Sequence, residues 1–342
     1  MDVRRVGGCP TVHEPGHTVA RVGTMDGPPL THRRLAFIIG KGGVGKTTVA
    51  AALALGLSDA GHRTLLLEVA SQTRTDALFG VAPSTVAPIE VRPDLFAMSI
   101  DAERATEEYL AAQLKVRPLV EMMARSRAFH QVTQAAPGLS ALVTIGKIWD
   151  LATSVRDGRP VWDRLVVDAP ATGHAVALLE VASSVRDIAG SGPVRDHADA
   201  IAKVIRHPDA TGVVVVAVPE DLAVTEAIEA IAALRARWLP VTCAVVNEVR
   251  HSPFGPADEV ALRAASGAPD ARAADRAAIG AARAVWAAAR HDDREVAGLA
   301  RECRVPVAVL PHVPDLSPGS GGLEALSAAL MADAAIGGVR AP

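Results

Sequence analysis

The stretch Gly40-Lys41-Gly42-Gly43-Val44-Gly45-Lys46-Thr47-Thr48 decides the fold of this chain. It matches the phosphate-loop pattern G-x-x-x-x-G-K-[ST], in which glycines let successive backbone N–H groups point at a bound triphosphate. An apolar, strand-like run at 35–39 precedes the loop, and an apolar, helix-like run at 49–57 follows it. The motif requires this strand–loop–helix context, so we expect the chain to bind a nucleotide.

The loop also assigns expected tasks to its side chains. Lys46 is expected to reach the β- and γ-phosphates of ATP, and the Thr47 hydroxyl to bind Mg²⁺. The helix that begins here adds the partial positive charge of its N-terminus. A chance match of a glycine-rich turn is the alternative. It is disfavoured because the chain has five lysines and two of them, Lys41 and Lys46, lie in this loop.

The composition excludes several classes of protein. The chain carries 35 basic and 38 acidic residues, a net charge of −3, which leaves no electrostatic footprint for nucleic acid or an anionic membrane. Continuous apolar runs, such as the one near 213–218, are far shorter than the roughly 20 residues of a membrane helix, so we expect no stable membrane insertion. Cys9, Cys243 and Cys303 are odd in number and lack C-x-x-C spacing. We therefore expect no disulfide framework, no zinc site and a cytoplasmic location.

Short apolar, β-branched runs alternate with helical stretches along the chain. The runs are 35–39, 64–69, 95–100, 164–168, 212–218, 242–247 and 305–310. This alternation predicts an α/β fold: a doubly wound, mostly parallel sheet of about seven or eight strands with helices on both faces. Ligands of such a sheet bind at the carboxyl ends of its strands.

The chain divides into three parts by composition. Residues 1–33 are rich in Gly, Pro, His and Arg without periodicity and are predicted to be a disordered leader, with Met25 as an alternative start. Residues 34–331 carry the strand and helix patterns and are predicted to form the nucleotide-binding domain. Residues 332–342 are expected to be a flexible tail.

Two intervals inside the domain are too long for simple crossovers between strands. Residues 101–160 and 176–206, approximately, show helical patterns and predict an inserted α-helical subdomain; the alternative is that they extend helices of the core. Residues 251–302 are very rich in Ala and Arg, which predicts solvated helices.

Two further polar residues end predicted strands. Asp168 follows an apolar strand that we expect to run parallel to the loop's strand, the position from which such enzymes hold Mg²⁺, here through a coordinated water. The turn 170–173 then forms a loop able to respond to the γ-phosphate. Asn247 ends another strand and offers a donor and an acceptor that suit the edge of adenine. Taken alone, such an Asp is more often a helix cap and such an Asn a turn residue.

These segments together resemble a known family. The loop 40–48 resembles the deviant Walker A motif of SIMIBI-class ATPases, whose early lysine reaches across a dimer. The segment 168–174 is similar to the Asp-Thr-Ala-Pro-Thr-Gly-His segment of the ArsA/Get3 family, and Val218-Pro219-Glu220, Thr225-Glu226 and Asn247 are similar as well. The likeness spans about 35–331.

The resemblance implies a dimeric, Mg²⁺-dependent ATPase in which nucleotide-driven dimer closure moves a helical effector subdomain. It implies that Lys41 contacts the partner's nucleotide, that Lys46 and Thr47 contact the local one, and that Asn247 contacts the adenine. A homodimer and a heterodimer with a related ATPase are both compatible with it.

The chain departs from the family at the switch I segment. The family places there an Asp that positions the attacking water, and Ala70 occupies that position. Glu68 lies two residues earlier on the same strand face. Three roles are open for it: it replaces the missing base, it binds Mg²⁺, or it is a buried polar residue of the strand. Asp76 is a further candidate. We therefore expect low intrinsic ATPase activity, and a weakly hydrolysing or non-hydrolysing regulatory subunit is the alternative function.

Other functions of related ATPases find less support. Residues 101–210 contain no cysteine, so an arsenite-type metalloid site is not expected. Iron–sulfur carriers need bridging cysteines on a dimer face. Partition or positioning ATPases similar to ParA or MinD need a basic stripe or a basic amphipathic terminal helix, and the sequence has neither.

Overall fold

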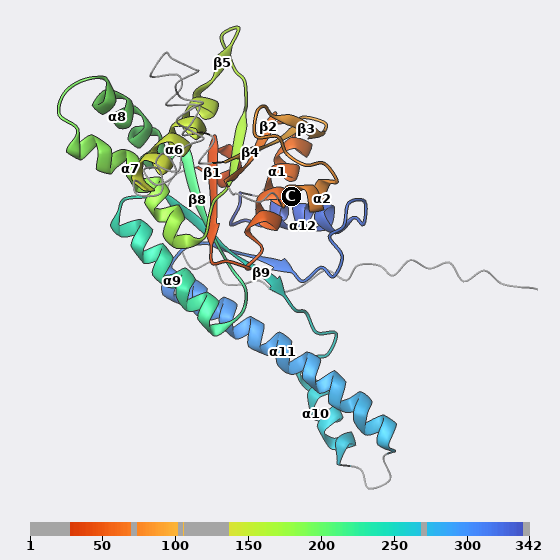
Figure 1. The fold of residues 1–342 in the computed structure, drawn as a ribbon. Coiled ribbons are helices and arrows are strands. Elements are labelled where there is room, and N and C mark those ends of the chain that lie inside the picture. Colours follow the sequence, from red (N-terminus) through yellow and green to blue (C-terminus); the bar gives the residue numbers. More distant parts are fainter. Residues whose placement is uncertain (1–27, 70–73, 102–104, 106–136, 268–271, 338–342) are drawn as a thin grey trace, which may run out of the picture.

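The computed structural model describes residues 28–69, 74–101, 105, 137–267 and 272–337 (Figure 1). Its strands are β1 (Leu35–Gly40), β2 (Thr64–Val69), β3 (Ile89–Arg92), β4 (Leu95–Ile100), β7 (Arg164–Asp168), β8 (Thr211–Ala217), β9 (Val241–Val249) and β10 (Val307–Pro311). In the described residues these form one eight-stranded sheet in the order β10-β9-β8-β1-β7-β2-β4-β3. Every neighbouring pair is parallel except β3 and β4. The doubly wound, mostly parallel sheet predicted from the sequence is confirmed.

The helices cover both faces of this sheet. They are η1 (Leu30–His32), α1 (Lys46–Asp59), α2 (Thr75–Phe79), α6 (Pro137–Thr153), α7 (Thr172–Ile188), α8 (Pro193–Arg206), α9 (Asp221–Ala236), α10 (Pro256–Ser266), α11 (Ala273–Cys303) and α12 (Gly322–Ala332). Strand side chains alternate between the faces. Leu35, Phe37 and Ile39 of β1 pack with α6, α7, α8, α9 and α11, whereas Ala36 and Ile38 pack with α1 and α12. Both faces of β1 are therefore buried, as its continuous apolar sequence predicts.

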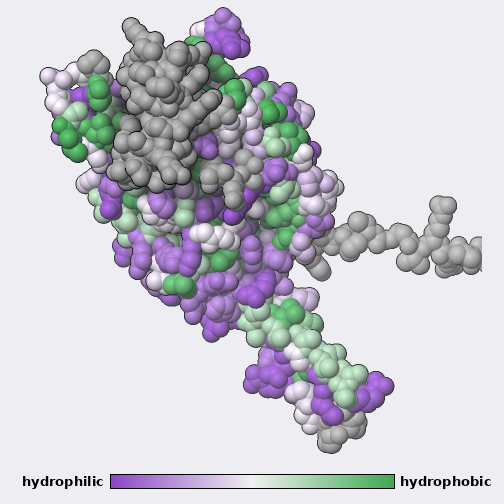
Figure 2. Space-filling model, in the orientation of Figure 1, coloured by the Kyte–Doolittle hydropathy of each residue, from purple (hydrophilic) through white to green (hydrophobic). Residues whose placement is uncertain are grey.

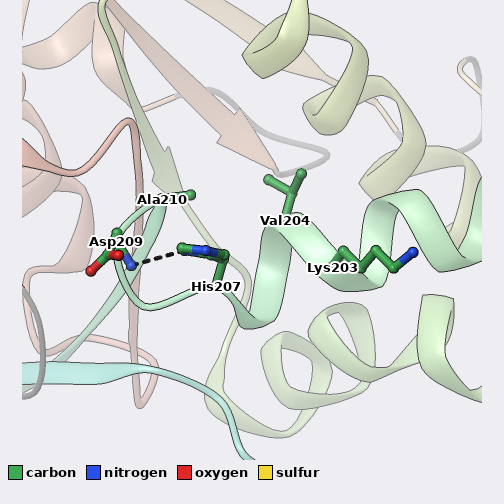
Figure 3. A pocket seen from close by; sticks show the side chains of 5 residues that line it. All are labelled: Lys203, Val204, His207, Asp209 and Ala210. Atoms are coloured by element: carbon green, nitrogen blue, oxygen red, sulfur yellow. Dashed lines mark hydrogen bonds between the residues drawn. The ribbon is translucent and has the colours of Figure 1, made fainter.

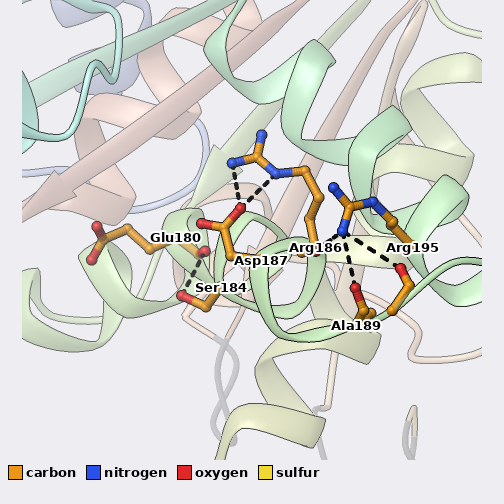
Figure 4. A network of polar contacts seen from close by, with 7 residues as sticks. Glu180, Ser184, Arg186, Asp187, Ala189 and Arg195 are labelled. Carbon is orange, nitrogen blue, oxygen red and sulfur yellow. Dashed lines mark hydrogen bonds and ion pairs between the residues drawn. The ribbon is translucent and has the colours of Figure 1, made fainter.

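The described part of the predicted helical insert forms α6, α7 and α8, and all three helices contribute residues to the core that contains Phe37 of β1. Arg195 fastens the turn between α7 and α8, because its guanidinium donates hydrogen bonds to the carbonyl oxygens of Arg186 (3.2 Å) and Ala189 (3.0 Å) (Figure 4). These bonds satisfy carbonyl groups left open at the end of α7. Residues 102–104 and 106–136 of the expected insert lie outside the described residues.

One part of the predicted insert is not helical. β5 (Val155–Arg156) and β6 (Arg159–Pro160) form a two-stranded hairpin where the sequence predicted helix up to residue 160. Asp157 and Gly158 connect the strands with φ angles of 53° and 74°. An Asp-Gly pair with two positive φ angles is the turn that best matches the twist of a hairpin, and it stops the helical pattern here.

The Ala- and Arg-rich segment forms α10 and α11. α10 and the first part of α11 extend from the body as an arm (Figure 1), whereas the end of α11 is packed in the core through Val296, Leu299 and Cys303 and is not a solvated helix. None of the residues of α10 is buried, and much of the arm's visible surface is pale in Figure 2, with hydrophilic groups gathered toward its tip. Alanine helix propensity and ion pairs stabilise such a solvated arm. One of these ion pairs joins Glu259 of α10 to Arg283 of α11 at 3.5 Å.

The packed part of the chain extends beyond both boundaries expected from the sequence, 34 and 331. Leu30 and Arg33 are buried, and Arg33 donates a hydrogen bond to the Thr211 carbonyl oxygen (2.9 Å). Ile336 is buried as well, and its carbonyl oxygen accepts a hydrogen bond from the backbone N–H of Thr31 (3.4 Å). Across the described residues, we find no helix whose length and apolar character would let it cross a membrane.

Candidate active site

The phosphate loop lies at the carboxyl end of β1, between β7 and β8 in the middle of the sheet. The chain order reverses on either side of β1, which makes this the topological switch point where α/β sheets bind ligands. The register pairs Ile38 with Asp168 and Asp168 with Glu68, so two carboxylates end neighbouring strands beside the loop.

The glycines of the loop have distinct spatial roles. Gly45 has a φ of 83°, and a Cβ added there would collide with the amide nitrogen of Asn247. Gly42 and Gly43 have open space where a Cβ would be, with nothing within 4 Å. The loop is therefore tight against the sheet on one side and open on the other, as a phosphate cradle requires.

Thr47 and Asp168 form the centre of the site. The Thr47 hydroxyl donates a 2.6 Å hydrogen bond to Oδ2 of Asp168, which is 6% exposed. Burial raises the pKa of Asp168 to about 6, and the nearby Glu68 adds to the rise, while the Thr47 hydroxyl, Lys46 and Arg74 oppose it.

A divalent ion fits this arrangement. Oδ1 of Asp168 is buried and has no hydrogen-bond partner among the described residues, so it is an open oxygen ligand. Mg²⁺ prefers hard oxygen ligands, and the carboxylate and the Thr47 hydroxyl are two of them. The two residues predicted to hold Mg²⁺ are thus side by side.

Lys46 lies half-buried at the first turn of α1. Its Nζ atom donates a hydrogen bond to the carbonyl oxygen of Lys41 (2.9 Å). Burial lowers the pKa of Lys46; Asp168 opposes this shift and Arg74 adds to it. The ammonium group thus has a hydrogen-bond acceptor in the backbone of its own loop.

Lys41, the second lysine of the loop, is bound to a different element. Its Nζ atom lies 2.8 Å from Oε1 of Glu226, in α9. Both side chains are a little more than one third exposed, at 38% and 37%. The lysine is therefore paired within its own subunit and still accessible to solvent.

Asn247 lies beneath the loop. Its side-chain amide donates a hydrogen bond to the Val44 carbonyl oxygen (3.2 Å), and the residue is buried. The missing Cβ of Gly45 makes room for this amide. The contact shows a supporting role for Asn247, and its contact with adenine stays a prediction.

Glu68 is buried and engaged at the start of α2. Oε1 accepts a hydrogen bond from the backbone N–H of Arg74 (2.6 Å), and Oε2 accepts bonds from the backbone N–H (3.3 Å) and hydroxyl (2.8 Å) of Thr75. Glu68 thus caps a helix end whose N–H groups have no partner inside the helix. Its role as a catalytic base stays a prediction, and Ala70 lies outside the described residues. Asp76 is exposed and accepts a hydrogen bond from the Ala77 N–H (2.9 Å).

Arg74 is a cation of this region that the sequence patterns missed. Its charge is close enough to add to the lowering of the Lys46 pKa and to oppose the rise of the Asp168 pKa, both of which are caused mainly by burial. In the sequence, Arg74 could be recognised only as an arginine five residues after the end of β2, the strand that pairs with β7. No known motif has an arginine at this position.

A pocket of about 310 Å³ lies elsewhere, where α8 leads into β8 (Figure 3). It is lined by Lys203, Val204, His207, Asp209 and Ala210, and the Asp209 backbone N–H donates a hydrogen bond to Nδ1 of His207 (3.2 Å). This is the amino end of β8, whereas the phosphate loop lies beside its carboxyl end. The pocket is therefore separate from the nucleotide site.

Comparison with known proteins agrees with this geometry. The family model described as anion-transporting ATPase (ArsA_ATPase) matches residues 33–190. ATPase BagA of Mycobacterium tuberculosis is 36% identical over 248 residues, which cover 71% of this chain and 72% of BagA. ATPase GET3B of Arabidopsis thaliana is 25% identical over 64% of this chain and 65% of its own length. An arsenical pump-driving ATPase of Acidiphilium multivorum is 26% identical over 46% of this chain and 27% of its own length. The loop, the Thr47–Asp168 pair and these relatives lead to one conclusion: the chain belongs to the ArsA/Get3 family of P-loop ATPases.

Proposed function

We propose that this ATPase is Mg²⁺-dependent and dimeric, and that ATP binding closes the dimer and moves the helical subdomain. The observation that carries the Mg²⁺ part of the proposal is the Thr47–Asp168 pair, with its open carboxylate oxygen beside the phosphate loop. The dimer part is supported by Lys41, whose accessible side chain lies in the same loop. Mg²⁺, when bound, neutralises negative charge that develops on the phosphate oxygens during phosphoryl transfer.

The chain's own groups perform the binding and orientation of ATP. The backbone N–H groups of 42–46 surround the β-phosphate, and Lys46 leaves the Lys41 carbonyl to pair with the β- and γ-phosphates. The side-chain NH₂ group of Asn247 supports the loop by its hydrogen bond to the Val44 carbonyl oxygen, and its side-chain oxygen accepts a hydrogen bond from the adenine. Catalysis here is mainly positioning and charge neutralisation.

Dimer closure uses Lys41. Lys41 is paired with Glu226 of its own subunit, and closure transfers it to the nucleotide of the partner subunit. The pair is more than one third exposed on both sides, so its net stabilisation is on the order of 0–1 kcal/mol and its rupture is easy. A phosphate chain with several negative charges is a stronger partner than one carboxylate.

The helical subdomain is connected directly to the metal-binding strand. β7 ends at Asp168 and α7 begins at Thr172, so only the three residues 169–171 connect them. α7 packs against α6 and α8, so a shift of the 169–171 turn is passed to the subdomain. This connection supports an effector role for α6–α8.

The alternative is a regulatory subunit that binds ATP and pairs with a catalytically complete relative. Ala70 supports it, since no carboxylate occupies the switch I position. The three hydrogen bonds that Glu68 already accepts also support it, because they occupy both carboxylate oxygens. We place either form in the cytoplasm, as Cys243 and Cys303 are free thiols.

Light scattering of the purified chain with Mg²⁺ and a non-hydrolysable ATP analogue tests the proposal. We expect the mass to double with the analogue and to stay monomeric without it, with Lys41→Ala remaining monomeric in both. A wild-type chain that binds the analogue and stays monomeric contradicts the homodimer. It favours the regulatory subunit instead.

A further inference from the structure

Three metal-binding side chains meet between α9 and α11, outside the nucleotide site. Asp221, His291 and Glu295 each offer one ligand atom, and these atoms all lie within 4.8 Å of one another. Nε2 of His291 lies 4.0 Å from Oδ1 of Asp221. Asp221 and Glu295 also line a groove of about 760 Å³ between the two helices.

The backbone holds these residues in place. His291 and Glu295 are four residues apart on α11, so they share one helix face. Asp221 is the first residue of α9, which runs along α11 (Figure 1). The two helices share a core that includes Ile231 and Leu299. The cluster is therefore built on two rigid, packed elements rather than on loops.

The carboxylates of this cluster, unlike other carboxylates on α11, are not paired with an arginine. On α11, Asp275, Asp292 and Asp293 each pair with an arginine. Within the described part of the chain, Glu295 forms no ion pair, and Asp221 lies within ion-pair distance of His291 alone. Arg294 and Arg301 line the same groove, yet neither pairs with these two carboxylates. Two carboxylates beside an imidazole are thus left for another cation.

We propose that Asp221, His291 and Glu295 bind a divalent transition-metal ion of the zinc type. Imidazole nitrogen and carboxylate oxygen are zinc ligands, with metal–ligand distances of about 2.0–2.2 Å, which place ligand atoms about 3.3 Å apart in a tetrahedron. The ligand atoms must therefore approach by about 1 Å from their present separations. The side chain of Asp221 is 86% exposed and free to make this movement.

This site differs in chemistry from the magnesium position at Asp168. It contains an imidazole, which suits zinc-type ions, whereas the Thr47–Asp168 pair offers only oxygen. It contains no cysteine, whereas the expectation of no zinc site rested on the number and spacing of the cysteines alone. Three protein ligands leave a fourth position for water or an exogenous group.

The bound ion would connect the arm to the nucleotide site. It joins α11 to the first turn of α9, and α9 also carries Glu226, the residue that pairs with Lys41. The proposal does not depend on ATP hydrolysis or on dimer closure. Metal binding alone tests it.

Calorimetric titration of the full, metal-stripped chain with Zn²⁺, without nucleotide, is the test. We expect one Zn²⁺ per chain in the wild type, and affinity at least tenfold weaker in His291→Ala and in Glu295→Gln. His251→Ala, an exposed histidine outside the cluster, and Glu302→Gln, a carboxylate of the same groove, are the matched controls and are expected to bind as the wild type does.

A second readout separates this site from other histidines of the chain. Co²⁺ in place of Zn²⁺ is expected to give visible absorption bands that His291→Ala loses and His251→Ala keeps. If His291→Ala does not fold, Asp221→Asn and Glu295→Gln carry the comparison. Titrations of the folded cluster variants that superimpose on the wild type overturn the proposal, because the ion is then bound elsewhere.

Discussion

Nζ of Lys41 lies 2.8 Å from Oε1 of Glu226, so the lysine that the family resemblance assigns to a partner's nucleotide is held by its own subunit. The two residues are 185 positions apart in the sequence and meet because α9 packs beside the phosphate loop. In the dimer closure proposed above, Glu226 competes with the partner's nucleotide for Lys41, and its removal is expected to favour the closed dimer.

Glu226→Gln tests this competition. With its charge removed, the side chain no longer holds Lys41 electrostatically, and dimer formation is expected at an ATP concentration two- to fivefold lower, since an exposed ion pair is worth up to about 1 kcal/mol. Light scattering across an ATP titration measures the shift. Glu229→Gln, on the same helix, is the control. An unchanged midpoint in Glu226→Gln means that the ion pair has no part in closure.

The raised pKa of Asp168 predicts a pH-dependent stability without Mg²⁺. Burial raises this pKa from 3.8 to about 6, so the native state holds the proton more tightly than the unfolded state between these values. The stabilisation is complete below pH 4 and is lost as the pH rises through 6. It amounts to about 3 kcal/mol in the free energy of unfolding.

Urea unfolding between pH 4 and 7 measures this effect, with Asp168→Asn as the reference that lacks the titrating group. We expect the difference in unfolding free energy between wild type and variant to change by about 2.4 kcal/mol across this range. Mg²⁺ with a nucleotide is expected to reduce the change, because the ion favours the ionised carboxylate. If the difference in unfolding free energy stays constant between pH 4 and 7, the raised pKa of Asp168 is contradicted.

Gly45 and Gly42 are expected to respond differently to alanine. Gly45→Ala places a Cβ against the Asn247 amide at a φ of 83°, so we expect a loss of about 1–3 kcal/mol in stability together with loss of ATP binding. Gly42→Ala meets nothing within 4 Å, so its melting temperature is expected to stay close to that of the wild type while its methyl group enters the phosphate space and weakens ATP binding. Thermal melts and equilibrium ATP binding measure both. If Gly45→Ala is as stable as the wild type, the close contact between Gly45 and the Asn247 amide is contradicted.

Glu68 is expected to matter first for stability. Glu68→Ala leaves the N–H groups of Arg74 and Thr75 without their acceptor, at a cost of about 1–3 kcal/mol. Urea unfolding measures it, and Asp76→Ala, an exposed carboxylate of the same helix, is the control. If Glu68→Ala unfolds at the wild-type urea concentration, the capping role is excluded. If its ATP turnover equals that of the wild type, Glu68 is not the catalytic base.

The parts of the site that follow from local patterns were predictable. The phosphate loop has a motif, and Asp168 ends an apolar strand whose parallel neighbour is β1. The sequence therefore predicts both at the carboxyl ends of neighbouring strands. The sheet itself followed from continuous apolar runs, and β3 was missed because it is a short, half-polar edge strand.

Other contacts depend on packing between distant segments. No local pattern encodes the amide of Asn247 beneath Val44, the pairing of Lys41 with Glu226, or the charge of Arg74 near Asp168. The burial of Leu30 and Ile336 likewise arises because the two ends of the domain meet at Thr31. Composition alone assigned both ends to flexible segments.

Steady-state ATP hydrolysis by the purified chain with Mg²⁺ tests the central claim most directly, with Lys46→Ala as the blank. We expect slow turnover that is clearly above the blank and that depends on Mg²⁺. Tight ATP binding with turnover no higher than that of Lys46→Ala contradicts an enzyme that works by itself, and leaves the chain as a nucleotide-binding subunit of a larger ATPase.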